Sequence, residues 1–115
     1  MAVRVFIDAG TVSLTGGDNT LVDFSSLTDV GRYGVTACSL YNNNATTETV
    51  SIYRSPNTTS ASGTLLDVVS IPRDSQEDVG GLIGLAIGNS DNIIAVSSAT
   101  GITATTALTT FGSND

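Results

Sequence analysis

Apolar and polar residues alternate along most of the chain, and stretches with helical periodicity are scarce. In residues 3–8, for example, Val3, Val5 and Ile7 are separated by other side chains. This period of two is typical of strands that bury one face. Clusters of Gly, Asn, Ser and Asp separate the alternating segments and favour turns. The pattern predicts eight or nine short strands, near residues 3–8, 11–15, 21–24, 34–41, 48–54, 64–71, 80–87, 92–98 and 102–111.

Short strands at this spacing, with turn residues between them, are typical of all-β proteins. We therefore expect a single-domain antiparallel β-sandwich or jelly roll that spans residues 1–115. Residues 1–8 could serve as a strand or arm that adds to the sheet of a neighbouring protein. A chain of 115 residues fits one domain and can bury a hydrophobic core without disulfides.

The strands expected at 34–41 and 48–54 are joined by an asparagine-rich turn, so we expect them to form a hairpin. A register shifted by one residue would place serine on the core face. In the register that buries apolar residues on one face of both strands, the cross-strand pairs are Leu40–Val50 and Cys38–Ile52.

The same parity argument points three aromatic side chains away from the core, namely Phe6, Tyr41 and Tyr53. Arg4 and Arg54 lie close to them in the sequence. Aromatic and arginine side chains contribute most of the binding energy at many protein interfaces. These five residues are therefore candidate partner contacts. The alternative is that a second sheet covers the aromatic residues, which would make them part of the core.

The strand expected at residues 64–71 is apolar on both faces. Its alternation places Leu65, Val69 and Ile71 on one face and Leu66 and Val68 on the other. Such a strand needs cover on both sides, either from its own fold or from a neighbouring protein.

The chain lacks most of the side chains that enzymes use. It has four arginines, no lysine, 11 acidic residues and no histidine, so its formal net charge is −7. Without histidine there is no imidazole base, no Ser-His-Asp triad and no His-bound zinc. Cys38 is the single cysteine, which excludes an internal disulfide, and we expect it to be a buried apolar residue. We therefore expect that the protein is not an enzyme and uses no cofactor.

Composition also argues against two classes of partner. An acidic chain with four arginines is poorly suited to neutralise a phosphate backbone, so we expect no nucleic acid partner. No apolar run approaches the ~20 residues of a membrane-spanning helix. The first residues carry no targeting signal, so we expect synthesis in the cytoplasm and no membrane partner.

The densest acidic segment is 74–78, where Asp74, Glu77 and Asp78 form a weak candidate for a calcium site. The ligand spacing of an EF-hand is absent, so a solvated turn is the favoured interpretation. A pair of hydrolytic carboxylates would need these residues to line a cleft.

Two segments resemble small structural proteins of tailed bacteriophages. One is 91–105, which resembles their C-terminal hairpin and follows the apolar run 82–87. The other is 38–54, with its strand, asparagine-rich turn and Ser-Ile-Tyr strand. Several such proteins are capsid decoration, or cement, proteins. The resemblance covers roughly residues 35–111 and implies a location on the outer capsid surface of the virion. The implied partners are the major capsid protein and further copies of the chain, as a homotrimer.

The absence of catalytic groups and this resemblance lead to one hypothesis: a capsid decoration protein that stabilises the phage head through protein–protein contacts. A head-tail, collar or fibre component of the virion is the first alternative. A carbohydrate-binding module for host attachment is the second, although the chain has no tryptophan and only three tyrosines to form a sugar platform.

Overall fold

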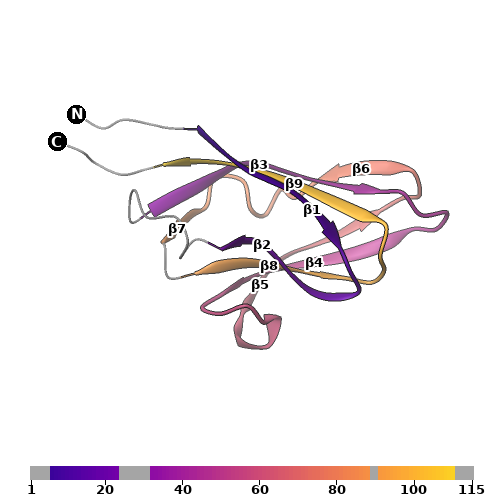
Figure 1. The fold of residues 1–115 in the computed structure, drawn as a ribbon, viewed down its shortest axis with the longest axis horizontal. Coiled ribbons are helices and arrows are strands. Elements are labelled where there is room, and N and C mark those ends of the chain that lie inside the picture. Colours follow the sequence, from indigo (N-terminus) through magenta and orange to yellow (C-terminus); the bar gives the residue numbers. More distant parts are fainter. Residues whose placement is uncertain (1–5, 24–31, 89–90, 111–115) are drawn as a thin grey trace.

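The computed structural model of the protein describes residues 6–23, 32–88 and 91–110, which form two facing antiparallel sheets (Figure 1). The expected all-β sandwich is therefore confirmed. The elements are β1 (Phe6–Leu14), β2 (Gly17–Asp23), β3 (Arg32–Asn42), β4 (Glu48–Ser55), the 3₁₀ turn η2 (Ser60–Ser62), β5 (Thr64–Ile71), β6 (Ser75–Asp78), β7 (Ala86–Gly88), β8 (Asn92–Ser97) and β9 (Ile102–Thr110).

The strand order is that of a jelly roll. One sheet has the order β1-β9-β3-β6, with β7 also paired to β3, and the other has the order β2-β8-β4-β5. The pairs β1–β9, β2–β8, β3–β6 and β4–β5 join strands from the two ends of the chain inward. These four pairs are those of one long hairpin that is rolled up so that its strands fall into two sheets, which is the topology of a jelly roll. The result is a thin body of 51 × 26 × 19 Å.

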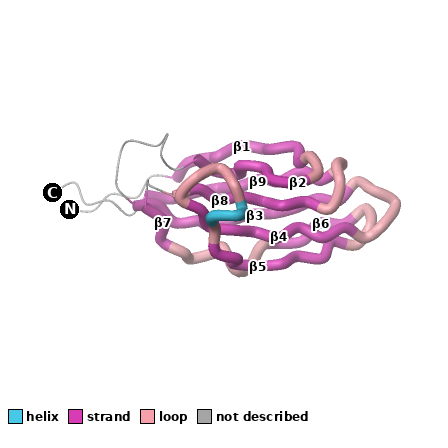
Figure 2. The backbone as a smooth tube through the Cα atoms, turned by 90° about the horizontal axis from the view of Figure 1, so that it is seen from below, coloured by secondary structure: helices cyan, strands magenta, loops and turns pink. Residues whose placement is uncertain are grey.

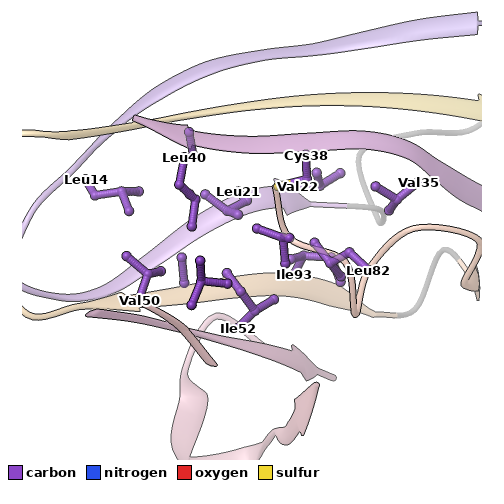
Figure 3. Packing of buried hydrophobic residues seen from close by; sticks show 14 of the residues in the cluster. Leu14, Leu21, Val22, Val35, Cys38, Leu40, Val50, Ile52, Leu82 and Ile93 are labelled. Carbon is purple, nitrogen blue, oxygen red and sulfur yellow. The ribbon is translucent and has the colours of Figure 1, made fainter. Parts of the chain in front are cut away.

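The core lies between the inner faces of the two sheets (Figure 3). Leu40 and Cys38 reach into it from the five-stranded sheet, and Val50 and Ile52 reach into it from the other sheet. All four side chains are almost completely removed from solvent. Their removal from water contributes about 1.5–3 kcal/mol for each large aliphatic side chain. The division into inward and outward residues was therefore predicted correctly for these two strands.

The hairpin expected between these two strands is wrong. β3 pairs with β9, β6 and β7, whereas β4 pairs with β5 and β8, so the two strands lie in different sheets. The segment 43–47 crosses from one sheet to the other instead of folding back in one plane. Sheets in a sandwich pack about 10 Å apart, a distance that a connection of five residues spans easily. Leu40 and Val50 consequently belong to opposite layers of the core rather than to one cross-strand pair.

The C-terminal hairpin suggested by the phage resemblance is wrong for the same reason. β8 belongs to the four-stranded sheet and β9 to the five-stranded sheet, and residues 98–101 cross between the sheets. The turn is held by the amide of Asn43, which donates to the carbonyl of Gly101 at 2.9 Å. This contact brings the two inter-sheet connections together at one end of the sandwich.

Three segments differ from the elements expected for them, namely residues 3–15, 74–78 and 80–87. The strands expected at 3–8 and 11–15 are, in the described part, the single strand β1, which continues through a bulge at Gly10 (φ +91°). The expected loop at 74–78 instead forms the edge strand β6. The strand expected at 80–87 is mostly turn, and only its end contributes to β7. Gly84 has a φ of +88°, a conformation that glycine adopts readily and that interrupts the strand there.

Residues 6–8 of the proposed N-terminal arm pair with β9 as part of an edge strand, and residues 1–5 lie outside the described part. Within that part, no helix is long and apolar enough to cross a membrane.

Candidate interaction surface

The outer face of the four-stranded sheet carries exposed apolar side chains. Leu65 and Val68 on β5 are 51% and 54% exposed. Across the sheet, Leu65 lies opposite Tyr53 on β4, and Val68 lies opposite Ser51, whose other neighbour is Val96 on β8. We call the set Tyr53, Leu65, Val68 and Val96 the apolar strip. Ser51 lies between Val68 and Val96, so the strip is apolar with one polar interruption. Apolar side chains gathered on one face mark protein-binding sites more often than scattered single residues do.

A bulge in β5 places Leu65 on this face. The register between β4 and β5 shifts between Ile52 and Tyr53, so that Leu66 is inserted without a directly opposed residue. Leu66 then packs against the core together with Val69, while Leu65 points outward. The expectation that Leu65 shares a face with Val69 is therefore wrong, because simple alternation does not hold across a bulge. The fold itself leaves both Leu65 and Val68 exposed.

Residues 56–63, which we call the strap, cross the same outer face beside the apolar strip (Figure 2). The 3₁₀ turn η2 in the strap lies against β4 and β8. Its Ser60 hydroxyl donates to Asp18 Oδ1 at 2.7 Å, and the Ser60 amide donates to Asp18 Oδ2 at 3.3 Å. A single carboxylate on β2 thereby holds the tip of the strap.

Internal hydrogen bonds give the strap its shape. The Oδ1 atom of Asn57 accepts from the amide and hydroxyl of Thr59 at 3.0 and 2.9 Å. The Ser55 hydroxyl donates to the Thr59 carbonyl at 2.8 Å, and Asn92 Nδ2 donates to the Asn57 carbonyl at 3.0 Å. Asn and Ser side chains commonly replace backbone partners in turns in this way.

The candidate aromatic residues do not form one site. Tyr53 is half-buried on the outer face of the four-stranded sheet, whereas Tyr41 is 40% exposed on the outer face of the other sheet, between Thr103 and Gln76. Both point away from the core, as expected. Because the two sheets are back to back, a single flat partner cannot contact both tyrosines of one molecule.

Of the two candidate arginines, the structure describes Arg54 and its contacts. Arg54 forms an ion pair with Asp91, in which Nη2 and Nε both lie 2.9 Å from Asp91 Oδ2. Its charge is therefore compensated within the molecule. Arg4 lies outside the described residues. Phe6 begins β1, but its side chain also lies outside the described part.

The carboxylates of the candidate calcium site do not converge. Glu77 and Asp78 are successive residues of β6, opposite Leu40 and Ser39, so their side chains point to opposite faces of the sheet. Asp74 lies in the preceding turn, with a φ of +50°. Nowhere in the described ranges do three or more His, Cys, Asp or Glu side chains form a group that could hold a metal ion. The segment is an exposed acidic sheet edge, and charged side chains at such edges oppose strand-to-strand aggregation.

Cys38 is a core residue whose thiol is shielded from solvent. Burial raises the pKa of the thiol above its ordinary value of 9.0, the hydrogen bond with Thr106 lowers it, and the charge of Asp78 raises it. The sulfur lies 3.6 Å from the Thr106 hydroxyl. A neutral, buried thiol reacts slowly because the thiolate is the nucleophile.

Sequence reasoning identified the strand at residues 64–71 as apolar on both faces, but it placed Leu65 on the wrong face and missed the strap and its anchor. Asp18 and Ser60 are 42 residues apart, and each resembles an ordinary turn residue in its own segment. Ile94 was likewise expected only as part of an apolar strand. Nothing in the local pattern of either segment shows that Asp18 and Ser60 meet.

No protein-family model and no curated protein matches this chain. Among solved structures, a chain from the structure of infectious bursal disease virus, Gx strain, is similar, with a TM-score of 0.45 and 12% sequence identity. The alignment covers 94% of this chain and 31% of that chain. The protein thus spans about a third of the length of its viral neighbour.

Proposed function

We propose that the protein is a virion structural protein, and specifically a capsid decoration protein that binds the outer surface of a tailed-phage head. The observation that carries the proposal is the apolar strip, four uncharged side chains gathered on one sheet face of an otherwise acidic protein. In this proposal the strip docks on the major capsid protein and excludes water from the contact. Binding, without a chemical reaction, stabilises the shell.

The fold supports this proposal without deciding it. Jelly rolls occur in viral capsid domains, and they also occur in lectins and cupins. A fold shared by so many functions cannot identify one of them, so the argument depends on the surface. The exposed strip offers apolar area for a protein partner, and the sandwich that carries it has a well-packed core.

A single copy has little apolar area with which to bind. Full burial of Leu65 and Val68, each already about half-buried, would contribute about 1 kcal/mol per side chain. That is modest compared with the cost of association, so a single strip would bind weakly. Assembly of the chain as a homotrimer, as we propose, would present three strips at once. Linked binding sites raise the overall affinity by about 10²–10⁴-fold when the geometry allows simultaneous contact.

The test is binding of the purified protein to phage heads that lack it. Wild type should bind saturably and raise the temperature at which the heads disrupt. The double variant Leu65→Ser/Val68→Ser should lose both effects while it keeps the wild-type unfolding temperature. Ile83→Ser is the matched control, because Ile83 is also exposed, at 44%, but lies outside the strip beside Val35 of the other sheet.

Absence of stoichiometric binding by wild type would contradict the proposal, as would equal binding by the double variant. The number of copies per virion separates a decoration protein from the alternatives. Hundreds of copies support decoration of the head, whereas a dozen or fewer would place the protein at the head-tail junction, the collar or a fibre.

A further inference from the structure

One apolar side chain on the outer face of the four-stranded sheet is buried although it faces away from the core. Ile94 lies opposite Tyr53 on the outer face of the four-stranded sheet, and its neighbours Ile93 and Ala95 point into the core. On an outer face such a side chain would ordinarily meet solvent, yet Ile94 is 0% exposed. The element lying over this face at β4 and β8 is the strap with its η2 turn (Figure 2).

The described attachments of the strap are hydrogen bonds. No residue of η2 is buried, and Pro56 and Ala61, the larger apolar residues of the strap, are exposed. Its tip is fixed to β2 through the two hydrogen bonds from Ser60 to Asp18. These two bonds lie at an exposed surface and exchange readily with bonds to water, so the tip opens at a small cost in free energy. The base of the strap stays attached through the bonds from the buried side chains of Ser55 and Asn92.

Removal of the strap would extend the apolar surface along β8, from Val96 to Ile94. Leu65, Tyr53 and Ile94 are consecutive cross-strand neighbours on β5, β4 and β8, so they form one row on the same face. The exposed end of this row, at Leu65, already belongs to the apolar strip, and its covered end is Ile94. The row is therefore complete only when the strap is displaced.

We infer that the strap is a displaceable cover and that the row Leu65–Tyr53–Ile94 is the docking site in its open state. The occupant is the apolar, uncharged surface of the capsid partner, so the inference depends on the proposed function. The closed strap keeps Ile94 from solvent in the free protein. Displacement adds the Ile94 side chain to the contact. The measured affinity is then the affinity of the open state multiplied by the fraction of molecules that are open, so it rises as more molecules open.

Two substitutions should open the strap without touching the row. Asp18→Ala removes both anchoring hydrogen bonds, and Ser60→Ala removes the shorter bond without a change of charge. Thr58→Ala is the matched control, since Thr58 is an exposed strap residue and none of the hydrogen bonds that hold the strap uses its side chain. Asp18→Ala should raise the open fraction about tenfold, and Ser60→Ala by a smaller factor.

Opening is measured directly through the methyl groups of Ile94, by NMR paramagnetic relaxation with a soluble gadolinium chelate. Binding to undecorated heads is measured on the same samples. Both anchor variants should increase the relaxation of the Ile94 methyl groups and increase head affinity by a matching factor. Thr58→Ala should change neither quantity. Ile94→Thr, introduced into Asp18→Ala, should reverse the gain in affinity.

Unchanged relaxation of the Ile94 methyl groups in both anchor variants would overturn the inference, because the strap would then be held by other contacts. Increased relaxation with unchanged or lower head affinity would also overturn it, since docking would then not use Ile94. Failure of wild type to bind heads at all would instead contradict the proposed function, and the relaxation result would show separately whether the strap opens.

Discussion

Asn42 is a completely buried amide at the end of β3, and its loss should destabilise the fold strongly. Its Nδ2 atom donates to the carbonyls of Thr46 at 2.8 Å and Ile71 at 2.9 Å, and its Oδ1 atom accepts from the amide of Asn44 at 2.9 Å. One side chain thereby joins the crossing between β3 and β4 to the end of β5. Asn42 therefore fixes the place where the chain leaves β3 for the other sheet, next to the end of β5.

The size of the effect follows from the hydrogen bonds that Asn42→Ala removes, which include a longer fourth bond from Nδ2 to the Pro72 carbonyl at 3.4 Å. A hydrogen bond contributes about 1 kcal/mol net, and a buried group left without a partner costs about 1–3 kcal/mol. Thr46 is exposed and Asn44 is half-buried, so water can replace the amide there, whereas Ile71 is buried. We therefore expect a loss of about 2–4 kcal/mol, a large share of the ~5–15 kcal/mol that stabilises a typical domain.

Urea unfolding followed by circular dichroism measures this loss. The midpoint should fall while the m-value stays constant, which shows that the native state still buries the same surface. Asn43→Ala is the control. Asn43 is exposed, and its backbone amide, which bonds to Gly101, is retained in alanine, so its effect should stay within about 0.5 kcal/mol. If Asn42→Ala were as stable as this control, the buried amide would contribute nothing net, and the reasoning would be refuted.

Three further predictions concern the core, the thiol and one turn. Leu40→Ala should cost about 2–5 kcal/mol in urea unfolding because it leaves a cavity between the sheets, whereas Ile83→Ala at an exposed site should cost about 0.5 kcal/mol or less. Equal losses would contradict the assignment of the core. The Cys38 thiol should react with Ellman's reagent only after unfolding. Because burial raises its pKa above 9.0, its contribution to stability is complete below pH 9.0 and is lost as the pH rises further, when the unfolded thiol ionises first. Cys38→Ala should not show this loss of stability above pH 9.0. If wild type and Cys38→Ala lost stability equally as the pH rises, the predicted contribution of the thiol would be wrong. Gly101→Ala should lower the unfolding midpoint, because residue 101 has a φ of +85° and the new Cβ would lie 2.6 Å from Asn44 Oδ1. An unchanged midpoint would contradict this prediction, because the turn at residue 101 would then accept the new Cβ without strain.

The surface residues were less predictable than the core. The outward direction of Tyr41 and Tyr53 follows from their position in an alternating strand, and the structure agrees. Their separation on opposite sides of the sandwich could not be foreseen, because it depends on which sheet each strand joins. The outward direction of Leu65 was missed because the bulge at Leu66 changes the parity of β5.

The alternation of apolar and polar residues was enough to establish that this chain forms strands and which side chains of β3 and β4 point inward. Alternation is a local property of one strand, since successive side chains point to opposite faces whatever lies beside the strand. Which strands are neighbours became clear only from the folded arrangement of the two sheets. A strand that buries one face satisfies that requirement equally well beside its partner or across the core from it, as Leu40 and Val50 show. The meeting of Asp18 with Ser60 and the cover over Ile94 have the same origin, because contacts between distant segments exist only after the two sheets have closed on each other.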